Sequence, residues 1–309
     1  MSGAGLNTNN LPARPMQVCA SWGRRFLLRA PEASTVLTIQ ARTRGKKMRP
    51  VTGDTVLARP LPNETDWLIE TINPRNNELV RPDSRGNREV LAANIDLMVV
   101  VICAAPAVDL FMVDRFLAGA RLMSCDAALV WNKADRNPAP DTLATYRDLG
   151  YPVLCTSAAS TEGLNGLQQL LASRTSILVG QSGVGKSSLV NAMVGEAQQR
   201  TSQISSSNDE GRHTTVAAQL IDLPDSGSVI DSPGVRDYAP HIPSVHDVAY
   251  GFVEISETSQ QCRFSDCLHR AEPHCAVKQA VEDGLIDSRR YQSFMRLAQL
   301  TRQLTQGRY

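Results

Sequence analysis

The stretch GQSGVGKSS, residues 180–188, has the glycine spacing of a phosphate-binding loop, with the apolar run SILV before it and SSLVNAMV after it. This strand–loop–helix context is what the P-loop pattern requires, and it disfavours the alternative of a glycine turn without a ligand. In such a loop, backbone N–H groups point at the phosphates, the lysine bridges the β- and γ-phosphates, and the serine hydroxyl ligates Mg²⁺. The predicted phosphate-binding residues are Gly180, Gln181, Ser182, Gly183, Val184, Gly185, Lys186, Ser187 and Ser188.

A second stretch, VWNKAD at 130–135, carries residues suited to reading a purine base. The Asp135 carboxylate can accept hydrogen bonds from both N1–H and the exocyclic amine of guanine, a pair of donors that adenine lacks. Asn132 can orient the base edge, and the stem of Lys133 can pack on the ring face. The next predicted strand ends in residues whose backbone N–H groups can meet guanine O6, namely Thr156, Ser157 and Ala158. Ligands of open parallel sheets bind beyond the carboxyl ends of the strands, so both stretches fit one guanine site.

Two motifs after the phosphate loop are suited to the γ-phosphate and its metal ion. VIDSPG, residues 229–234, gives Asp-x-x-Gly, in which Asp231 would hold the Mg²⁺ shell through water and the Gly234 N–H would contact the γ-phosphate. Asp-Ser-Pro-Gly is also a common turn sequence, so the motif gains weight only from its place after the loop. The polar segment 205–216 offers Thr215 or Thr214 to close over Mg²⁺, although a linker with an incidental threonine pair is the alternative.

The order of these motifs is unusual, because the base-reading residues precede the phosphate loop in the chain. A parallel sheet fixes where its strands lie in space but not their order along the chain, provided that old termini are joined and new ones open at the surface. The order therefore indicates a circularly permuted domain.

Three cysteines and a histidine crowd together near the C-terminus, in the stretch CRFSDCLHRAEPHC. Three thiolates and one imidazole make a closed tetrahedral Zn²⁺ site, which indicates a structural ion because no position is left for water. The predicted ligands are Cys262, Cys267, His269 and Cys275. His274 is a spare imidazole that would replace His269 only if the loop ran differently. The scattered cysteines are expected to be small core residues, namely Cys19, Cys103, Cys125 and Cys155.

The elements that position these residues divide the chain into four parts. Residues 1–15 are expected to be a disordered tail, and 16–88 alternate as short strands of a small antiparallel barrel or sandwich. Residues 89–240 alternate buried apolar strands with helices, which predicts a doubly wound, mostly parallel α/β domain. Residues 241–309 are expected to form a helical zinc-binding domain. The longest apolar run, 97–108, is too short to cross a bilayer, and the cysteine pattern suits the cytoplasm.

Charge is nearly balanced overall, at a formal net value of +1, but it is uneven along the chain. Residues 14–89 hold fourteen arginines and lysines against eight acids, so the first domain is basic. The stretch RTRGKKMR contributes the predicted RNA-binding residues Arg42, Arg44, Lys46, Lys47 and Arg49. Such a cluster supplies sequence-independent affinity for a phosphate backbone, and a solvated hairpin turn is the alternative.

The motif order, with GRHTT and DSPG following the phosphate loop, resembles that of the circularly permuted GTPases. Together with the basic first domain, the Cys/His cluster and the stretches NPRNNELVRPD and ANIDLMVVV, the chain resembles the RsgA (YjeQ) family of small-ribosomal-subunit-dependent GTPases. The resemblance implies an OB-fold barrel, a permuted P-loop GTPase domain and a zinc-binding helical domain. It further implies a monomer that uses GTP with Mg²⁺, carries one structural Zn²⁺, binds rRNA and assists late maturation of the small ribosomal subunit.

The residue that would orient the attacking water is not evident. Many GTPases place glutamine directly after Asp-x-x-Gly, whereas this chain has Val235 and then Arg236. The resemblance implies slow intrinsic turnover that the small subunit accelerates, with Lys186 and Thr215 as catalytic residues. His213 is a candidate for the residue that orients the attacking water, and the alternative is that it is a solvated histidine in a loop. An RNA-binding module that only switches with nucleotide is a second hypothesis, and Asp135 opposes an ATP-using enzyme. The second switch, DSPGVRDY, runs on into the zinc domain within thirty residues, so we hypothesise that nucleotide state sets the orientation of that domain.

Overall fold

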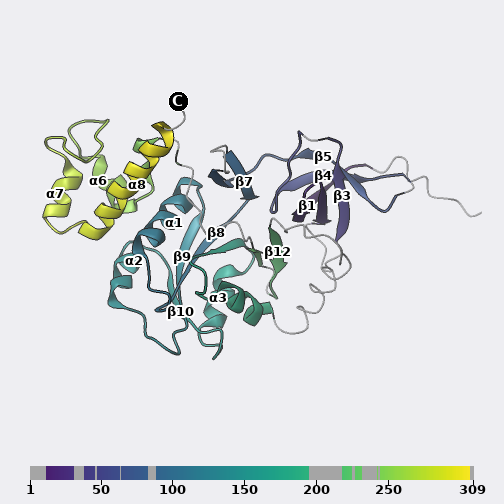
Figure 1. The fold of residues 1–309 in the computed structure, drawn as a ribbon, viewed down its shortest axis with the longest axis horizontal. Helices are drawn as coiled ribbons and strands as arrows, with labels where there is room; N and C mark the ends of the chain where they lie inside the picture. Colours follow the sequence, from purple (N-terminus) through teal and green to yellow (C-terminus); the bar gives the residue numbers. More distant parts are fainter. Residues whose placement is uncertain are drawn as a thin grey trace, which may run out of the picture.

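The computed structural model describes residues 12–30, 38–45, 47–62, 64–82, 88–194, 218–224, 227–231, 242 and 244–306. Along this chain a β-barrel, an α/β domain and a group of helices follow one another, and Figure 1 shows them side by side in that order. No helix of the described residues is both long enough and apolar enough to cross a membrane.

The first domain is a closed barrel of five strands. They are β1 (Arg14–Trp22), β2 (Arg25–Arg29), β3 (Ile39–Thr43), β4 (Thr55–Pro60) and β5 (Trp67–Ile72). Their order is β1-β2-β3-β5-β4, and pairing of β4 with β1 closes the barrel. β3 and β5 run parallel, while the other pairs are antiparallel. The core includes Val18, Leu28, Val56 and Ile69, all fully buried. This closed five-stranded barrel confirms the OB-fold prediction, and β1 begins inside the segment assigned to the tail.

A separate hairpin links the barrel to the α/β domain. Its strands are β6 (Glu78–Pro82) and β7 (Arg88–Ala93), which form a two-stranded sheet of their own. Figure 1 shows this hairpin between the barrel and the helices of the α/β domain.

The central sheet has the order β10-β9-β8-β11-β13-β12. Its strands are β8 (Leu97–Ile102), β9 (Asp126–Asn132), β10 (Val153–Thr156), β11 (Thr175–Val179), β12 (Gln219–Asp222) and β13 (Ser228–Asp231). β10, β9, β8, β11 and β13 are parallel, and only β12 is antiparallel to its neighbour β13. The circularly permuted, mostly parallel GTPase fold predicted from the sequence is confirmed.

Helices cover both faces of this sheet. Successive side chains of β8 point to opposite faces, and every residue of this strand is buried because both faces are covered. Met98, Val100 and Ile102 pack with α1 (Leu110–Leu122) in one cluster. Leu97, Val99 and Val101 pack in the other with α3 (Leu164–Leu171) and the helical residues 186–194. A 3₁₀ turn, Asp141–Leu143, leads into the short helix α2 (Ala144–Asp148).

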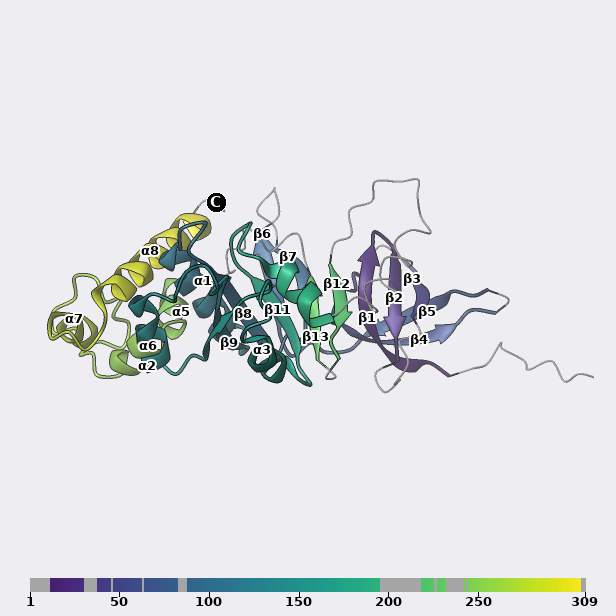
Figure 2. The same cartoon turned by 90° about the horizontal axis from the view of Figure 1, so that it is seen from below.

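The barrel and the central sheet are joined through β12. Ala20 of β1 pairs with Gln219, so the two sheets are hydrogen-bonded into one (Figure 2). The Thr52 hydroxyl donates to the carbonyl of Ala218 at 2.9 Å, and Arg29 forms an ion pair with Asp222. In the sequence, β12 closely follows the polar segment 205–216, in which Thr214 or Thr215 is predicted to close over Mg²⁺.

The C-terminal helices pack against α1. They are α5 (Val245–Tyr250), α6 (Val253–Ser259), α7 (Ala276–Glu282) and α8 (Ser288–Gln306). Ser244 and Asp247 form a capping box that marks the start of α5, a helix that was not predicted from the sequence. At the start of α8, the Asp287 carboxylate accepts the Arg290 N–H at 2.9 Å. Phe294 and Ala298 of α8 are buried in one cluster with Phe252, and Tyr291 and Met295 pack against that cluster.

A buried ionic network, the α1–α8 lock, connects the central and C-terminal domains. It consists of Asp114, Tyr146, Glu254, Arg289 and Arg290. Asp114 accepts from Arg290 Nη1 and Arg289 Nη1 at 2.7 Å each and from the Tyr146 hydroxyl at 2.8 Å. Arg290 also donates to Glu254 through Nε at 2.7 Å and Nη2 at 2.9 Å. Burial alone would lower the pKa of Arg290, but its bonds to Glu254 and the charge of Asp114 raise that pKa overall, so the guanidinium stays charged.

Candidate functional site

The phosphate loop lies between β11 and the helical residues 186–194 and has the backbone conformation that its glycines permit. Gly180, Gly183 and Gly185 have φ values of 138°, 84° and 97°, in the region that favours glycine. A Cβ on Gly180 would lie 2.2 Å from the carbonyl oxygen of Val101 on β8. The Lys186 ammonium folds back over the loop, donating to the carbonyls of Gly180 at 2.7 Å and Gln181 at 2.9 Å. The charged group therefore stands where a bound phosphate chain would need it.

The base-reading stretch contacts the phosphate loop directly, although about fifty residues separate the two in sequence. The Asn132 side chain, which is 1% exposed, donates to the carbonyl of Val184 at 2.9 Å. The Lys133 ammonium donates to the carbonyl of Gly183 at 2.7 Å and to that of Ala105 at 3.1 Å. Two residues predicted to read the base thus also hold the phosphate loop, and the motifs form one site.

The strand ends place the remaining predicted base residues beside this contact. Asn132 ends β9 and Thr156 ends the adjacent β10, and the Thr156 hydroxyl donates to Asn132 Oδ1 at 3.3 Å. The Ser157 N–H is already used by the carbonyl of Glu162 at 2.9 Å. In the described part of the chain, the Ala158 N–H donates to no protein acceptor, so it is available to a ligand.

The side chain of Asp135 is 27% exposed. Its carboxylate lies 3.7 Å from Arg136 Nε, a contact too long for a good hydrogen bond. The carboxylate is therefore accessible to a base.

Of the residues predicted for Mg²⁺ and the γ-phosphate, Ser187 and Asp231 are described. Asp231 is exposed at the end of β13, the strand adjacent to β11, so it and the phosphate loop follow neighbouring strands. Thr214, Thr215, His213 and Gly234 lie outside the described residues.

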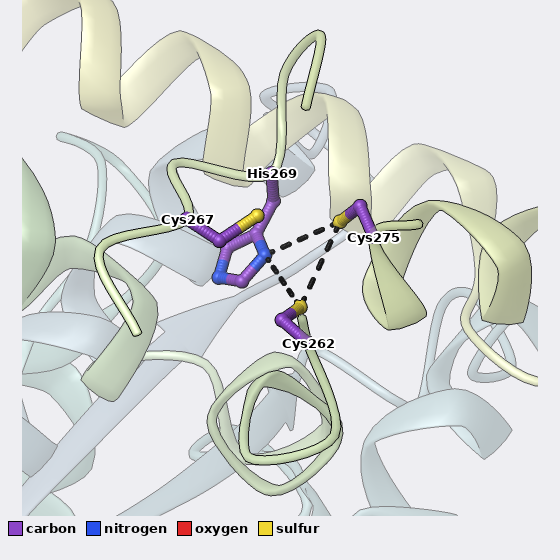
Figure 3. A group of neighbouring side chains, drawn as sticks. All are labelled: Cys262, Cys267, His269 and Cys275. Carbon is purple, nitrogen blue, oxygen red and sulfur yellow. Dashed lines mark hydrogen bonds between the residues drawn. The ribbon is translucent and has the colours of Figure 1, made fainter. Parts of the chain in front are cut away.

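The four predicted metal ligands converge in one cluster (Figure 3). His269 Nδ1 lies 3.5 Å from Cys262 Sγ and 3.4 Å from Cys275 Sγ, and these two sulfurs are 3.9 Å apart. All four ligand atoms, Cys267 Sγ included, lie within 4.8 Å of one another. Around a tetrahedral Zn²⁺, two sulfurs are about 3.8 Å apart and a sulfur and a nitrogen about 3.5 Å apart. The donor set and its spacing therefore fit a zinc ion with no open position.

Burial also acts on the ligand groups. It raises the pKa of the Cys267 thiol to about 12 and lowers the pKa of His269. A bound dication converts such thiols to thiolates. The Tyr291 hydroxyl donates to the carbonyl of His269 at 2.6 Å and holds this ligand loop against α8.

Glu272 orders the same loop, although the sequence did not single it out. Its carboxylate accepts the N–H groups of Leu268, Arg270 and Ala271 at 2.8–3.2 Å. Desolvation would raise the pKa of Glu272, but these backbone donors outweigh it and lower the pKa to about 2. In the sequence, the Glu272–Pro273 pair shortly after His269 is the feature that could have indicated this role.

The residues of the predicted RNA-binding loop differ in their charge pairing. Arg42 donates two hydrogen bonds to Glu64, at 2.9 and 2.8 Å, so its charge is already paired. Arg44, Lys47 and Arg49 are exposed, and Lys46 lies outside the described residues.

Cys19, Cys103 and Cys125 are buried as expected, but the prediction was wrong for Cys155, which is exposed on β10 at the edge of the sheet.

Comparison with known proteins identifies the family to which this arrangement belongs. The family model RsgA GTPase matches residues 72–240. A relative from Alcanivorax borkumensis, named small ribosomal subunit biogenesis GTPase RsgA, is 39% identical over 285 residues, which cover 90% of this chain and 81% of the relative. The chain belongs to the RsgA GTPase family. It is accordingly a GTPase, a hydrolase acting on the anhydride bond of GTP.

Other RsgA relatives and solved structures agree. A Pseudomonas fluorescens protein of the same name is 43% identical over 250 residues, covering 79% of this chain and 73% of the relative. The crystal structure of YloQ, described as a circularly permuted GTPase, superposes with a TM-score of 0.73 at 28% identity and covers 94% of this chain and 96% of its own. YjeQ from Thermotoga maritima gives the same TM-score and identity, covering 94% and 98%.

Proposed function

We propose that this protein hydrolyses GTP during late maturation of the small ribosomal subunit, and that the subunit stimulates the hydrolysis. The observation that carries the proposal is the contact between base-reading and phosphate-binding residues, from Lys133 to Gly183 and from Asn132 to Val184. It supports a complete guanine nucleotide site. The biological setting is supported by relatives named small ribosomal subunit biogenesis GTPase over most of this chain.

Each part of the nucleotide has a proposed partner. Asp135 accepts from the guanine N1–H and amine, and the Ala158 N–H donates to O6. Lys186 neutralises charge on the β- and γ-phosphates, and the backbone N–H groups of residues 180–188 support it. Ser187 and Asp231 would hold Mg²⁺, which supplies further charge neutralisation on the phosphates. For the γ-phosphate and the attacking water, Thr214, Thr215, Gly234 and His213 remain proposals from the sequence.

The other cofactor and partners are proposed from the remaining features. One structural Zn²⁺ is held by Cys262, Cys267, His269 and Cys275, whose spacing supports it. The barrel binds rRNA through its basic loop, and the protein acts as a monomer in the cytoplasm.

An RNA-binding switch with negligible turnover is the alternative, favoured by the absence of glutamine after Asp-x-x-Gly. Phosphate release over many turnovers, measured with GTP and with ATP, separates the two functions. The proposal expects slow but continuing release from GTP and none from ATP. A single round of release, or none, would favour the alternative, and equal release from ATP would contradict the base assignment.

A further inference from the structure

A groove of about 960 Å³ lies where the barrel, the β6–β7 hairpin and α1 meet. Lys47 and Arg49 of the basic loop line it on the barrel side, and Asn73 and Asn76 line it from the segment that leads to the hairpin. The end of α1, at residues 122–124, forms part of its opposite wall. This volume is at the upper end of the range of about 300 to 1,000 Å³ that holds single ligands. It is separate from the nucleotide site, since none of the residues that line it belongs to residues 130–135 or 180–188.

The groove carries more positive than negative charge. Glu78 is shared by Arg75 and Arg88, whereas Asp247 accepts from the N–H and hydroxyl of the neutral Ser244 at 3.0 and 2.8 Å and keeps its negative charge. Arg75 is further held by Asp54, whose side chain is fully buried. Lys47 and Arg49 form no ion pair with any described residue, and both are exposed. Two cations are thus available to a ligand.

Neutral hydrogen-bonding groups lie beside these cations. Within the described ranges, the side-chain amides of Asn73 and Asn76 have no hydrogen-bond partner in the protein. An amide offers two donors and an acceptor, the combination that matches the edge of a nucleic-acid base. Ile72, Leu122 and Met123 add apolar surface between the polar groups.

We infer that this groove binds a single-stranded segment of RNA. The cations suit its phosphates, the free amides suit the edges of unstacked bases, and the apolar side chains suit sugar and base faces. A duplex would fit less well, because proteins recognise RNA helices mostly by shape and by contacts to phosphates and 2′-hydroxyls, whereas hydrogen bonds to base edges go mainly to unstacked bases of single strands. An acidic peptide would also satisfy Lys47 and Arg49, and the competition experiment below distinguishes it from RNA. The inference rests on the proposed function and adds to it the place and strandedness of the RNA.

The test uses the full-length protein and a short, unstructured, fluorescent oligouridylate. Replacing Lys47 and Arg49 together by Ala should weaken binding and make the dependence of log K on log salt shallower by about 1.4, because each phosphate contact on a single strand contributes about 0.7. Asn76→Asp adds a carboxylate within the groove and should weaken binding about tenfold. Asn165→Asp makes the same chemical change at an exposed position on α3 outside the groove, and it should leave the affinity unchanged.

Thermal unfolding midpoints confirm that the variants are folded. Unchanged affinity and salt slope in both groove variants would overturn the inference, as would equal losses in Asn76→Asp and Asn165→Asp. Displacement of the RNA by oligoglutamate as readily as by unlabelled oligouridylate would assign the groove to an acidic peptide instead. Stimulation of GTP hydrolysis by small subunits is measured separately. If the stimulation persists while the groove variants bind RNA normally, the assignment of RNA to the groove is wrong and the proposed function stands. If small subunits do not stimulate hydrolysis by the unaltered protein, the proposed function is wrong.

Discussion

Replacing Asp114 by Ala should loosen the C-terminal helices from the central domain, because this side chain is the centre of the α1–α8 lock. Asp114 is fully buried and accepts three hydrogen bonds, from Arg289, Arg290 and Tyr146. Breaking a buried ion pair by removing one partner costs about 3–5 kcal/mol. Arg290 would keep its two bonds to Glu254, and Arg289, with 31% of its side chain exposed, could turn to water. We therefore expect a loss near the lower end, about 3 kcal/mol.

Urea unfolding of the full chain measures the loss, and hydrogen exchange localises it. Exchange should accelerate in α1 and α8 and stay unchanged in the barrel. Asp148→Ala, at an exposed position on α2, is the matched control and should change stability by less than about 0.5 kcal/mol. A double-mutant cycle with Arg290→Met should give a coupling of about 1–3 kcal/mol. A loss below about 1 kcal/mol, or a coupling near zero, would refute the lock.

The lock also bears on how the domains move. From the sequence we hypothesise that nucleotide state sets the orientation of the zinc domain, and this stays a prediction. In the structure, α8 is held to α1 through a charged Arg290 that is 1% exposed. Burial and the charge of Asp114 raise the pKa of Tyr146, so its hydroxyl stays protonated and donates to the carboxylate. Free rotation of the zinc domain against α1 would have to break this network.

Three further predictions concern the two sites. Asp135→Asn replaces one acceptor by a donor that faces the guanine N–H groups. We expect GTP affinity, measured by competition binding, to fall at least about 100-fold and xanthosine triphosphate to bind better than GTP. An unchanged preference for GTP would remove Asp135 from the base site. Lys186→Ala should lower the GTP hydrolysis rate about 100-fold in single-turnover assays, and a loss below about threefold would contradict its role. Cys275→Ser should lower zinc content, measured by atomic emission, and unfold the 262–275 loop first; full retention of one zinc per chain would show that Cys275 is not a ligand.

Residue types and spacing were sufficient to predict the sites where the chemistry itself sets the pattern. The glycines of residues 180–185 are required by positive φ values, and the four zinc ligands lie within a few residues of one another. Both patterns are local, so the sequence displays them. The permuted order was also readable, because strand ends of a parallel sheet share one edge whatever their order in the chain.

What the sequence could not show depends on contacts between distant residues. Asp114 and Arg290 look like ordinary surface residues of amphipathic helices until the fold buries them together. Pairing of Ala20 with Gln219 joins two domains through a single register that no local pattern encodes. Cys155 was expected in the core because its strand is apolar, but β10 is the edge strand and leaves it exposed.

The central claim is that this GTPase works on the small ribosomal subunit. GTP hydrolysis by the full-length protein should be measured alone, with purified small subunits and with purified large subunits. The account predicts slow hydrolysis by the protein alone, clear stimulation by small subunits and none by large ones, with Lys186→Ala inactive throughout. Equal stimulation by both subunits, or none by either, would contradict it.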